Sequence, residues 1–271
     1  MTNSVLPSVE VSPSGVNVRA DDETVHDPKQ SLVTVIVPVF NEARTIYETL
    51  RQVVAELTPK EVIVVDDGST DGTNHLLERF QHDWCFGASV PHVERVLVLH
   101  HHHNMGKGCA VRTGLGAARG EYAVVQDADL ELSPDSYADL LKPLIEKKAD
   151  IVVGNRFQVT PSRGRFFHQA GILFLNLLVR ILYGIRLHDE ACCFKMLRLC
   201  DFHRMSLECR RFEFCPEVVA KAARLGLRFT EVPVAYTPRL EVDGKKLRLR
   251  DGLCAMQVLW KLRNWRESPD K

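Results

Sequence analysis

The stretch Val124-Val125-Gln126-Asp127-Ala128-Asp129-Leu130-Glu131 decides the fold of this chain. Apolar residues from Tyr122 to Val125 predict a buried strand, and Ser133-Pro134 predict the N-cap and first turn of a helix. A strand that delivers aspartates at its carboxyl end is typical of an open α/β sheet, where ligands bind at that end. Because alternate residues of an extended chain point to the same side, we expect Asp127 and Asp129 to share a face.

These carboxylates predict a metal site. Two convergent aspartates, with Glu131 continuing the series, suit a hard divalent cation such as Mg²⁺ or Mn²⁺, which keeps positions open for phosphate oxygens. Asp127, Asp129 and Glu131 are therefore the expected metal ligands. The alternative is an acidic loop that caps the next helix, since the D-x-D pattern alone is common.

Composition limits the domain organisation and the partners. The chain has 271 residues, of which 45% are hydrophobic, so it can bury the core of one large domain. Residues 1–31 show no sustained periodicity and are predicted to be a disordered tail, and residues 32–271 to form a single domain. The formal net charge is zero, which argues against nucleic acid as a partner.

Cysteine usage and hydropathy bear on the compartment. The 8 cysteines form no C-x-x-C pair and show no zinc-binding spacing, and no secretory signal is recognised. No apolar run reaches the roughly 18 residues that a membrane-spanning helix needs. We therefore expect reduced thiols in a cytoplasmic protein.

Apolar, β-branched runs alternate with amphipathic patterns between residues 32 and 156. Five runs are expected as strands, at residues 32–38, 61–65, 96–99, 122–125 and 150–156. Strands separated by helices predict an α/β fold with a mostly parallel sheet covered by helices.

A second carboxylate-rich turn, Asp66-Asp67-Gly68-Ser69-Thr70-Asp71-Gly72-Thr73, follows the strand at 61–65. Carboxylates accept hydrogen bonds from base or ribose and glycines permit close backbone approach, so this turn can hold a nucleotide. An ordinary strand-to-helix connection is the alternative. Lys107, which begins a helix between two glycines, could attract phosphate. The histidines at 100–103 are expected to be structural or incidental, because consecutive side chains cannot easily chelate one ion.

Two later segments each allow two interpretations. Residues 171–187 form an apolar helix in which Asn176, Arg180 and Gly184 recur every four residues, so it is either buried or placed at a membrane interface. Residues 238–250 are basic and contain a glycine, which fits a clamp on a polyphosphate. A solvated charged face would give the same pattern.

Taken jointly, several motifs resemble those of family-2 glycosyltransferases. Within that family, the chain resembles the dolichyl-phosphate mannose and glucose synthase branch. The motifs that carry this resemblance are Val35–Glu42, Val64–Thr73, Asn104–Gly108, Asp127–Glu131 and Arg211–Glu217. The strand Glu231–Val234, followed by Arg239 and Gly244-Lys245-Lys246, is similar to the closing motif of that branch.

The resemblance implies a GT-A fold, with a nucleotide-binding half at about 32–130 and an acceptor-binding half at about 131–265. It implies that Arg156, and less directly Arg163 or Arg165, binds an acceptor phosphate. Asp127, Ala128 and Asp129 would hold metal and diphosphate. The implied set of donor-binding residues is Pro38, Phe40, Glu42, Val65, Asp67, Lys107, Asp127, Ala128, Arg239 and Lys245.

The implied reaction is transfer of a hexose, with inversion, from a nucleotide diphosphate sugar to a polyprenyl phosphate at the cytoplasmic face of a membrane. Asp129, Arg156, Arg239 and Lys245 would carry it; a lipid phosphate is already anionic and needs no general base. If the acceptor were a hydroxyl of a glycan or glycolipid, Asp189 would be the base. The motifs leave two further functions open: an enzyme that makes nucleotide sugars, and a non-catalytic sugar-nucleotide-binding protein.

Overall fold

The computed structural model describes residues 33–86, 90–159, 166–238 and 249–268. In these ranges seven strands form one sheet in the order β3-β2-β1-β4-β6-β5-β7. The strands are β1 (Val33–Val39), β2 (Lys60–Asp66), β3 (Val93–His100), β4 (Tyr122–Val125), β5 (Ile151–Asn155), β6 (Lys195–Arg198) and β7 (Phe229–Pro233). Neighbouring strands are parallel except where β6 pairs with β4 and with β5. The predicted α/β fold with a mostly parallel sheet is confirmed.

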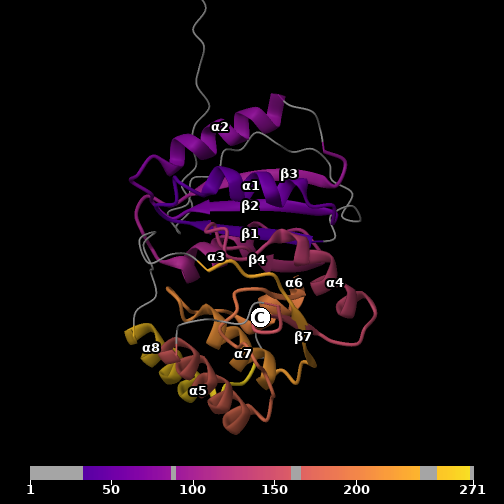
Figure 1. Ribbon diagram of the computed structural model, residues 1–271, viewed down its shortest axis with the longest axis vertical. Coiled ribbons are helices and arrows are strands. Elements are labelled where there is room, and N and C mark those ends of the chain that lie inside the picture. Colours follow the sequence, from indigo (N-terminus) through magenta and orange to yellow (C-terminus); the bar gives the residue numbers. More distant parts are fainter. Residues whose placement is uncertain (1–32, 87–89, 160–165, 239–248, 269–271) are drawn as a thin grey trace, which may run out of the picture.

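Helices flank this sheet, some of them directly against it and others against neighbouring helices (Figure 1). They are α1 (Ile46–Ala55), α2 (Thr73–Phe86), α3 (Lys107–Ala117), α4 (Tyr137–Ile145), α5 (Phe166–Tyr183), α6 (Leu199–Met205), α7 (Phe214–Arg224) and α8 (Leu249–Leu262). The helices α5 and α8 lie side by side at the end of the molecule away from β3 (Figure 1). The hydroxyl of Tyr183 donates to the carbonyl of Leu259 at 2.6 Å and joins these two helices.

The centre of the sheet explains the apolar runs of the sequence. Every residue of β1 and of β2 is buried, as expected for parallel strands covered by helices on both faces. The strand order reverses at β1, because β2 and β3 lie on one side of it and β4 lies on the other. A crevice outside the carboxyl ends of the strands at such a reversal is where open α/β sheets bind ligands.

Strand β6 was not expected from the sequence. It has four residues and begins with the buried Lys195, so no alternating or β-branched pattern marks it. The Lys195 ammonium donates to the carbonyl of Glu190 at 2.7 Å and also to that of Cys192, which satisfies the charged group inside the core.

The apolar helix α5 differs from its predicted form. It ends at Tyr183, and Gly184 adopts a left-handed conformation with φ of 73°, the usual geometry just past a helix C-terminus. The proposed stripe also divides, since Asn176 is buried whereas Arg180 is exposed. Among the helices of the described residues, none combines the length and the hydropathy of a membrane-spanning segment.

Candidate functional site

The loops that follow β1 and β2 are bound to each other. Asn41 has a φ of 53°. Its side-chain Oδ1 accepts from the Thr70 backbone amide at 2.8 Å, and its backbone amide donates to Ser69 Oγ at 2.9 Å. The Glu42 amide donates to Thr73 Oγ1 at 3.0 Å. The carboxylate-rich turn therefore holds the β1 loop in place, which brings Phe40 and Glu42 to the same edge of the sheet.

The predicted donor residues on β1 and β2 are neighbours. Pro38 is the Cα partner of Val65 in the parallel pairing of the two strands, and Asp67 donates its amide to the carbonyl of Val39 at 2.8 Å. Ala128, in the loop after β4, joins the same region, because Thr45 Oγ1 donates to its carbonyl at 2.7 Å and contacts Glu42 Oε2 at 3.2 Å. Contact of these residues with a nucleotide stays a prediction.

Asp67 anchors the loop before α3. Its Oδ1 accepts from the Met105 amide at 2.9 Å and its Oδ2 from the Gly106 amide at 2.7 Å, and the side chain is buried. The ring of His101 lies 2.6 Å from the same carboxylate and 2.9 Å from Thr113 Oγ1. His100 Nδ1 also lies 3.3 Å from Asp66 Oδ2. Two members of the histidine run thus have structural contacts, in agreement with the sequence interpretation, and the pattern of consecutive histidines alone could not show which.

The acidic loop is a turn, and the extended geometry expected for it is wrong. Strand β4 ends at Val125, Leu130 has a φ of 60°, and Asp129 Oδ1 accepts from the Glu131 amide at 3.1 Å. The buried side chain of Gln126 stabilises this turn, because its Nε2 donates to the carbonyl of Leu132 at 3.0 Å. The argument from strand alternation for a shared face of Asp127 and Asp129 therefore does not apply.

A metal fits the chemistry of this loop. Among the described residues, no three or more His, Cys, Asp and Glu side chains form a group arranged to hold a metal ion, so the predicted ligands do not form a ready-made cage. Mg²⁺ typically takes one or two carboxylates and completes its shell with water and substrate phosphates. Partly exposed aspartates at 127 and 129 match that requirement, and the ligand assignment stays a prediction.

Lys107 lies beside the first aspartate of the loop. Its ammonium forms an ion pair with Asp127 and lies 3.4 Å from Cys193 Sγ. Burial tends to lower the pKa of Lys107, but attraction by Asp127 outweighs it and holds that pKa well above its ordinary value. Lys107 therefore stays protonated next to the acidic loop.

The predicted attraction of phosphate by the N-terminus of α3 does not hold for the helix amides. The amides of Gly108 and Cys109 donate to the carbonyls of Arg211 and Arg210, at 3.1 and 3.3 Å. A side chain at Gly106 would meet the Arg210 carbonyl oxygen at 2.2 Å, so glycine is required where the two segments touch. Lys107 can still contribute its side-chain charge.

Arg156, which follows β5, forms a bidentate pair with Asp189. Its Nε and Nη2 lie 2.7 and 2.8 Å from the two carboxylate oxygens, and the Asp189 side chain is fully buried. Burial tends to lower the pKa of Arg156, but the hydrogen bonds to Asp189 outweigh burial and raise the pKa above its ordinary value. Both oxygens of Asp189 are thus engaged, which favours an orienting role over the predicted role of a base; its role stays a prediction.

The acceptor side is joined to the acidic loop through Tyr236. The Arg156 guanidinium lies over the Tyr236 ring at 5.1 Å, and Tyr236 forms an isolated β-bridge with Leu132. Next to it, the Thr237 amide donates to the carbonyl of Glu131 at 2.8 Å. The structure therefore brings the Arg156 region and the loop from 127 to 131 together, and the roles expected for these residues stay predictions. Arg163, Arg165, Arg239 and Lys245 lie outside the described residues.

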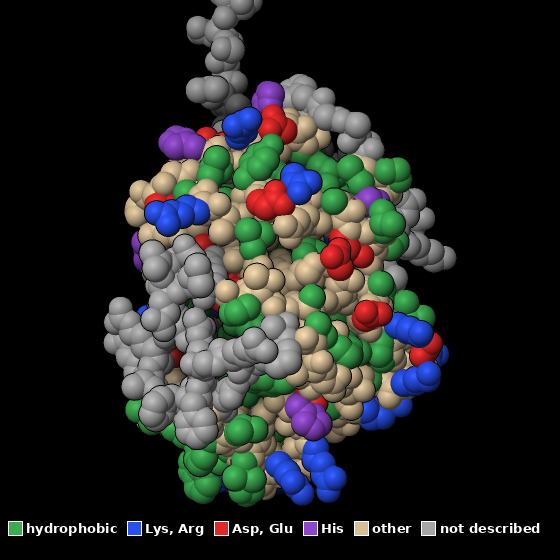
Figure 2. Space-filling model, in the orientation of Figure 1, with side chains coloured by type: hydrophobic (Ala, Val, Ile, Leu, Met, Phe, Trp, Pro, Cys, Tyr) green, Lys and Arg blue, Asp and Glu red, His purple; other side chains and the backbone are tan. Residues whose placement is uncertain are grey.

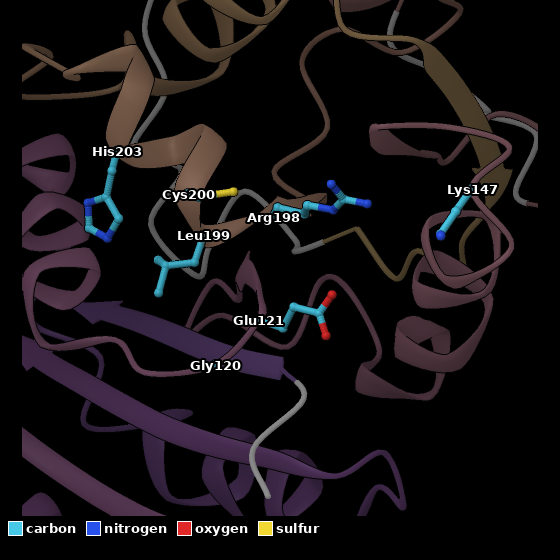
Figure 3. Close-up of a pocket in the computed structure, with 7 residues that line it drawn as sticks. All are labelled: Gly120, Glu121, Lys147, Arg198, Leu199, Cys200 and His203. Carbon is cyan, nitrogen blue, oxygen red and sulfur yellow. The ribbon is translucent and has the colours of Figure 1, made fainter. Parts of the chain in front are cut away.

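A separate hollow of about 660 Å³ is lined by Gly120 and Glu121, which precede β4, whereas the acidic loop follows β4 at its other end. Arg198, Cys200 and His203 line it from β6 and α6, and Glu121 lies below them (Figure 3). None of the predicted site residues that the structure describes lines this hollow. The candidate site is therefore the edge that carries the acidic loop.

Comparison with known proteins identifies the family. The model of the family described as glycosyl transferase family 2 matches residues 34–204, which include both acidic turns and Arg156. The chain belongs to glycosyl transferase family 2. It is therefore a glycosyltransferase, as the motifs indicated.

Two relatives of this family-2 chain share one name, and a solved structure shares its fold. Dolichyl-phosphate beta-glucosyltransferase from Drosophila melanogaster is 31% identical, over 83% of this chain and 72% of the relative. Dolichyl-phosphate beta-glucosyltransferase ALG5A from Trichomonas vaginalis is 27% identical, over 89% and 75%. Glucosyl-3-phosphoglycerate synthase from Mycobacterium tuberculosis, in complex with Mn²⁺, UDP and glucosyl-3-phosphoglycerate, is 20% identical with a TM-score of 0.60, over 88% of this chain and 82% of that one. The predicted GT-A type of fold is confirmed.

Proposed function

We propose that this family-2 glycosyltransferase moves a hexose from a nucleotide diphosphate sugar to a polyprenyl phosphate, with inversion at the anomeric carbon and with Mg²⁺ or Mn²⁺ bound. The names of the dolichyl-phosphate beta-glucosyltransferases support the lipid phosphate acceptor. The Mn²⁺ and UDP in the glucosyl-3-phosphoglycerate synthase complex support the metal and the class of donor.

The observation that carries this proposal is the oriented guanidinium of Arg156 next to the acidic loop. Asp189 takes two of its five N–H donors and fixes the plane of the fork, which leaves the remaining donors for an anion. A planar guanidinium recognises phosphate oxygens in pairs. Both oxygens of Asp189, the candidate base, accept from Arg156. An acceptor that is already negatively charged fits this site, because it needs no base.

The chemistry then depends on charge neutralisation and positioning. The acceptor phosphate oxygen attacks the anomeric carbon while the bond to the nucleotide diphosphate breaks, and no proton has to be removed from the nucleophile. Lys107, and the predicted clamp of Arg239 and Lys245, would balance the negative charge that grows on the leaving diphosphate. A divalent cation held by Asp127 and Asp129 would supply Lewis-acid stabilisation to the same group.

The surface of α5 and α8 fits a membrane partner. Large hydrophobic side chains project from these two helices, and the space-filling view shows hydrophobic side chains gathered over them (Figure 2). The exposed members are Leu173, Phe174, Leu177, Ile181, Leu253 and Trp260. Arg180 and Lys261 are exposed among them and can contact anionic headgroups. We infer peripheral attachment here, with the acceptor presented from the cytoplasmic leaflet.

A transfer assay tests the proposed function. UDP-glucose, GDP-mannose and UDP-N-acetylglucosamine are each offered with a short polyprenyl phosphate, with Mg²⁺, with Mn²⁺ and with chelator. We expect one donor to yield a glycosylated lipid phosphate only when a metal is present. Transfer that survives Asp129→Ala at full rate, or nucleotide binding with no transfer from any donor, would overturn the proposal.

A further inference from the structure

We propose that Glu231 is a positioning residue for the acceptor phosphate, acting through Asp189 on Arg156. This inference rests on the proposed function, in which Arg156 binds the acceptor. It adds a residue of β7 that touches neither donor nor acceptor and yet sets the direction in which the guanidinium points.

Glu231 holds the backbone on which Asp189 stands. Its Oε1 accepts from two consecutive amides, those of His188 at 2.8 Å and Asp189 at 3.0 Å. Its Oε2 lies 2.6 Å from the Nδ1 of His188. Three contacts thus converge on one carboxylate, which has a side-chain exposure of only 10%. A two-residue segment with no regular structure of its own is fixed in this way.

Asp189 passes this constraint to Arg156. Its carboxylate accepts from Nε and Nη2 of Arg156, and its Oδ2 also accepts from the Arg156 amide at 3.1 Å. The guanidinium and the backbone amide of Arg156 therefore both donate to a single aspartate. Any movement of Asp189 would rotate the guanidinium fork.

The sheet explains why a residue of β7 can do this. Strand β7 pairs in parallel with β5, and Glu231 is the Cα partner of Val153, three residues before Arg156. Arg156 follows β5, and Glu231 lies on β7, the strand next to β5. Glu231 therefore links this strand pair to the loop that contains Asp189, which orients Arg156. A short chain of hydrogen bonds links one rigid strand pair to the acceptor-binding group.

The expected effect of losing Glu231 is a lower affinity for the acceptor with an unchanged affinity for the donor. By analogy with outer-shell partners of metal ligands, whose loss costs about 10-fold or more, we expect Glu231→Ala to weaken binding of the acceptor phosphate about 10-fold. Glu231→Gln keeps an oxygen that accepts from both amides, so it should bind the acceptor close to the unmodified level.

The test is calorimetric binding of geranyl phosphate, and separately of UDP or GDP, whichever the unmodified protein binds. Asp150→Asn is the matched control, because Asp150 forms a bidentate pair with Arg228 at the other end of the β5–β7 pair. We expect Glu231→Ala to lose affinity for geranyl phosphate alone and Asp150→Asn to lose neither affinity. Should Glu231→Ala fail to fold, Glu231→Asp takes its place, since it keeps the charge but shortens the reach by one methylene.

The outcomes separate this inference from the proposed function. If Arg156→Ala abolishes binding of geranyl phosphate but Glu231→Ala leaves it unchanged, the positioning role is wrong and the acceptor role of Arg156 stands. Equal losses of geranyl phosphate and nucleotide affinity in Glu231→Ala would show a merely structural role and also overturn it. If Arg156→Ala binds geranyl phosphate normally, the proposed acceptor site fails, and the positioning role with it.

Discussion

The Lys107 ammonium forms an ion pair with the Asp127 carboxylate, so the first aspartate of the acidic loop has a positive partner supplied by α3. Neither group is fully enclosed, since the two side chains are 17% and 26% exposed. A divalent cation that binds Asp127 must share this carboxylate with the lysine or displace it. The pair therefore predicts competition between Lys107 and the metal in the absence of donor.

Replacing Lys107 should strengthen metal binding by the nucleotide-free protein. We expect Lys107→Met to bind Mn²⁺ about 10-fold more tightly, since a hydrogen bond to a charged group is worth roughly 1.5 kcal/mol or more. Manganese electron paramagnetic resonance measures the bound fraction directly. Arg112→Met, which removes an exposed cation from the same helix, is the control and should change nothing. Unchanged Mn²⁺ affinity in Lys107→Met would contradict a shared carboxylate.

Asp189 should be important for stability as well as for binding. Asp189→Asn leaves the largely buried Arg156 without its charge partner, which typically costs about 3–5 kcal/mol when the pair is buried. Urea unfolding measures the loss. Asp150→Asn, which breaks a more exposed pair with Arg228, should cost far less. Similar losses in the two variants would show that burial of the Arg156 pair is not the decisive factor.

Acid sensitivity is expected at Glu217. Burial tends to raise its pKa, but hydrogen bonds from Lys221 and the Glu208 amide outweigh it and lower the pKa below its ordinary 4.5. The stability that this carboxylate contributes is therefore present above pH 4.5 and is lost as the pH falls through the lowered pKa. Glu217→Gln should be less stable than the unmodified protein above pH 4.5, and this deficit should shrink below it. Urea unfolding across that range measures it; a deficit that does not change with pH would contradict the assignment.

Membrane attachment should depend on the outer face of α5. Leu177 and Ile181 are 50% and 70% exposed, and burying such a side chain in lipid is worth roughly 1.5–3 kcal/mol. The double variant Leu177→Glu, Ile181→Glu should therefore pellet with vesicles at least about 10-fold less well. Leu57→Glu is the control, because Leu57 is 76% exposed but follows α1. Equal pelleting of both variants would rule out α5 as the docking face.

The strands and their polar ends could be predicted because the information is local. Runs such as Val62–Val65 are apolar on both faces, and a carboxylate-rich turn follows them directly in the sequence. Since parallel strands share one edge for their carboxyl ends, the gathering of Glu42, Asp67 and Asp127 follows from strand order alone. Arg156 likewise follows a predicted strand, whereas its acceptor-binding role came from the family resemblance and stays a prediction.

The remaining features depend on partners that are distant in the sequence. The four residues of β6 form a strand only because β4 and β5 lie on either side of them. The capping of α3 by the carbonyls of Arg210 and Arg211 needs a contact across about 100 residues, and no local signal marks it. The turn at Leu130 is local, but its positive φ and the hydrogen bond from Gln126 to Leu132 across it do not follow from strand alternation.

The most direct test of the account is a comparison of two acceptors that differ only in the phosphate. A short polyprenyl phosphate and the matching polyprenol are offered with the preferred α-linked nucleotide sugar, and the lipid products are analysed by mass spectrometry and by NMR of the anomeric centre. We predict a β-linked hexosyl phosphate lipid from the phosphate acceptor and no product from the alcohol. Transfer to the alcohol, or retention of the α configuration, would contradict the account.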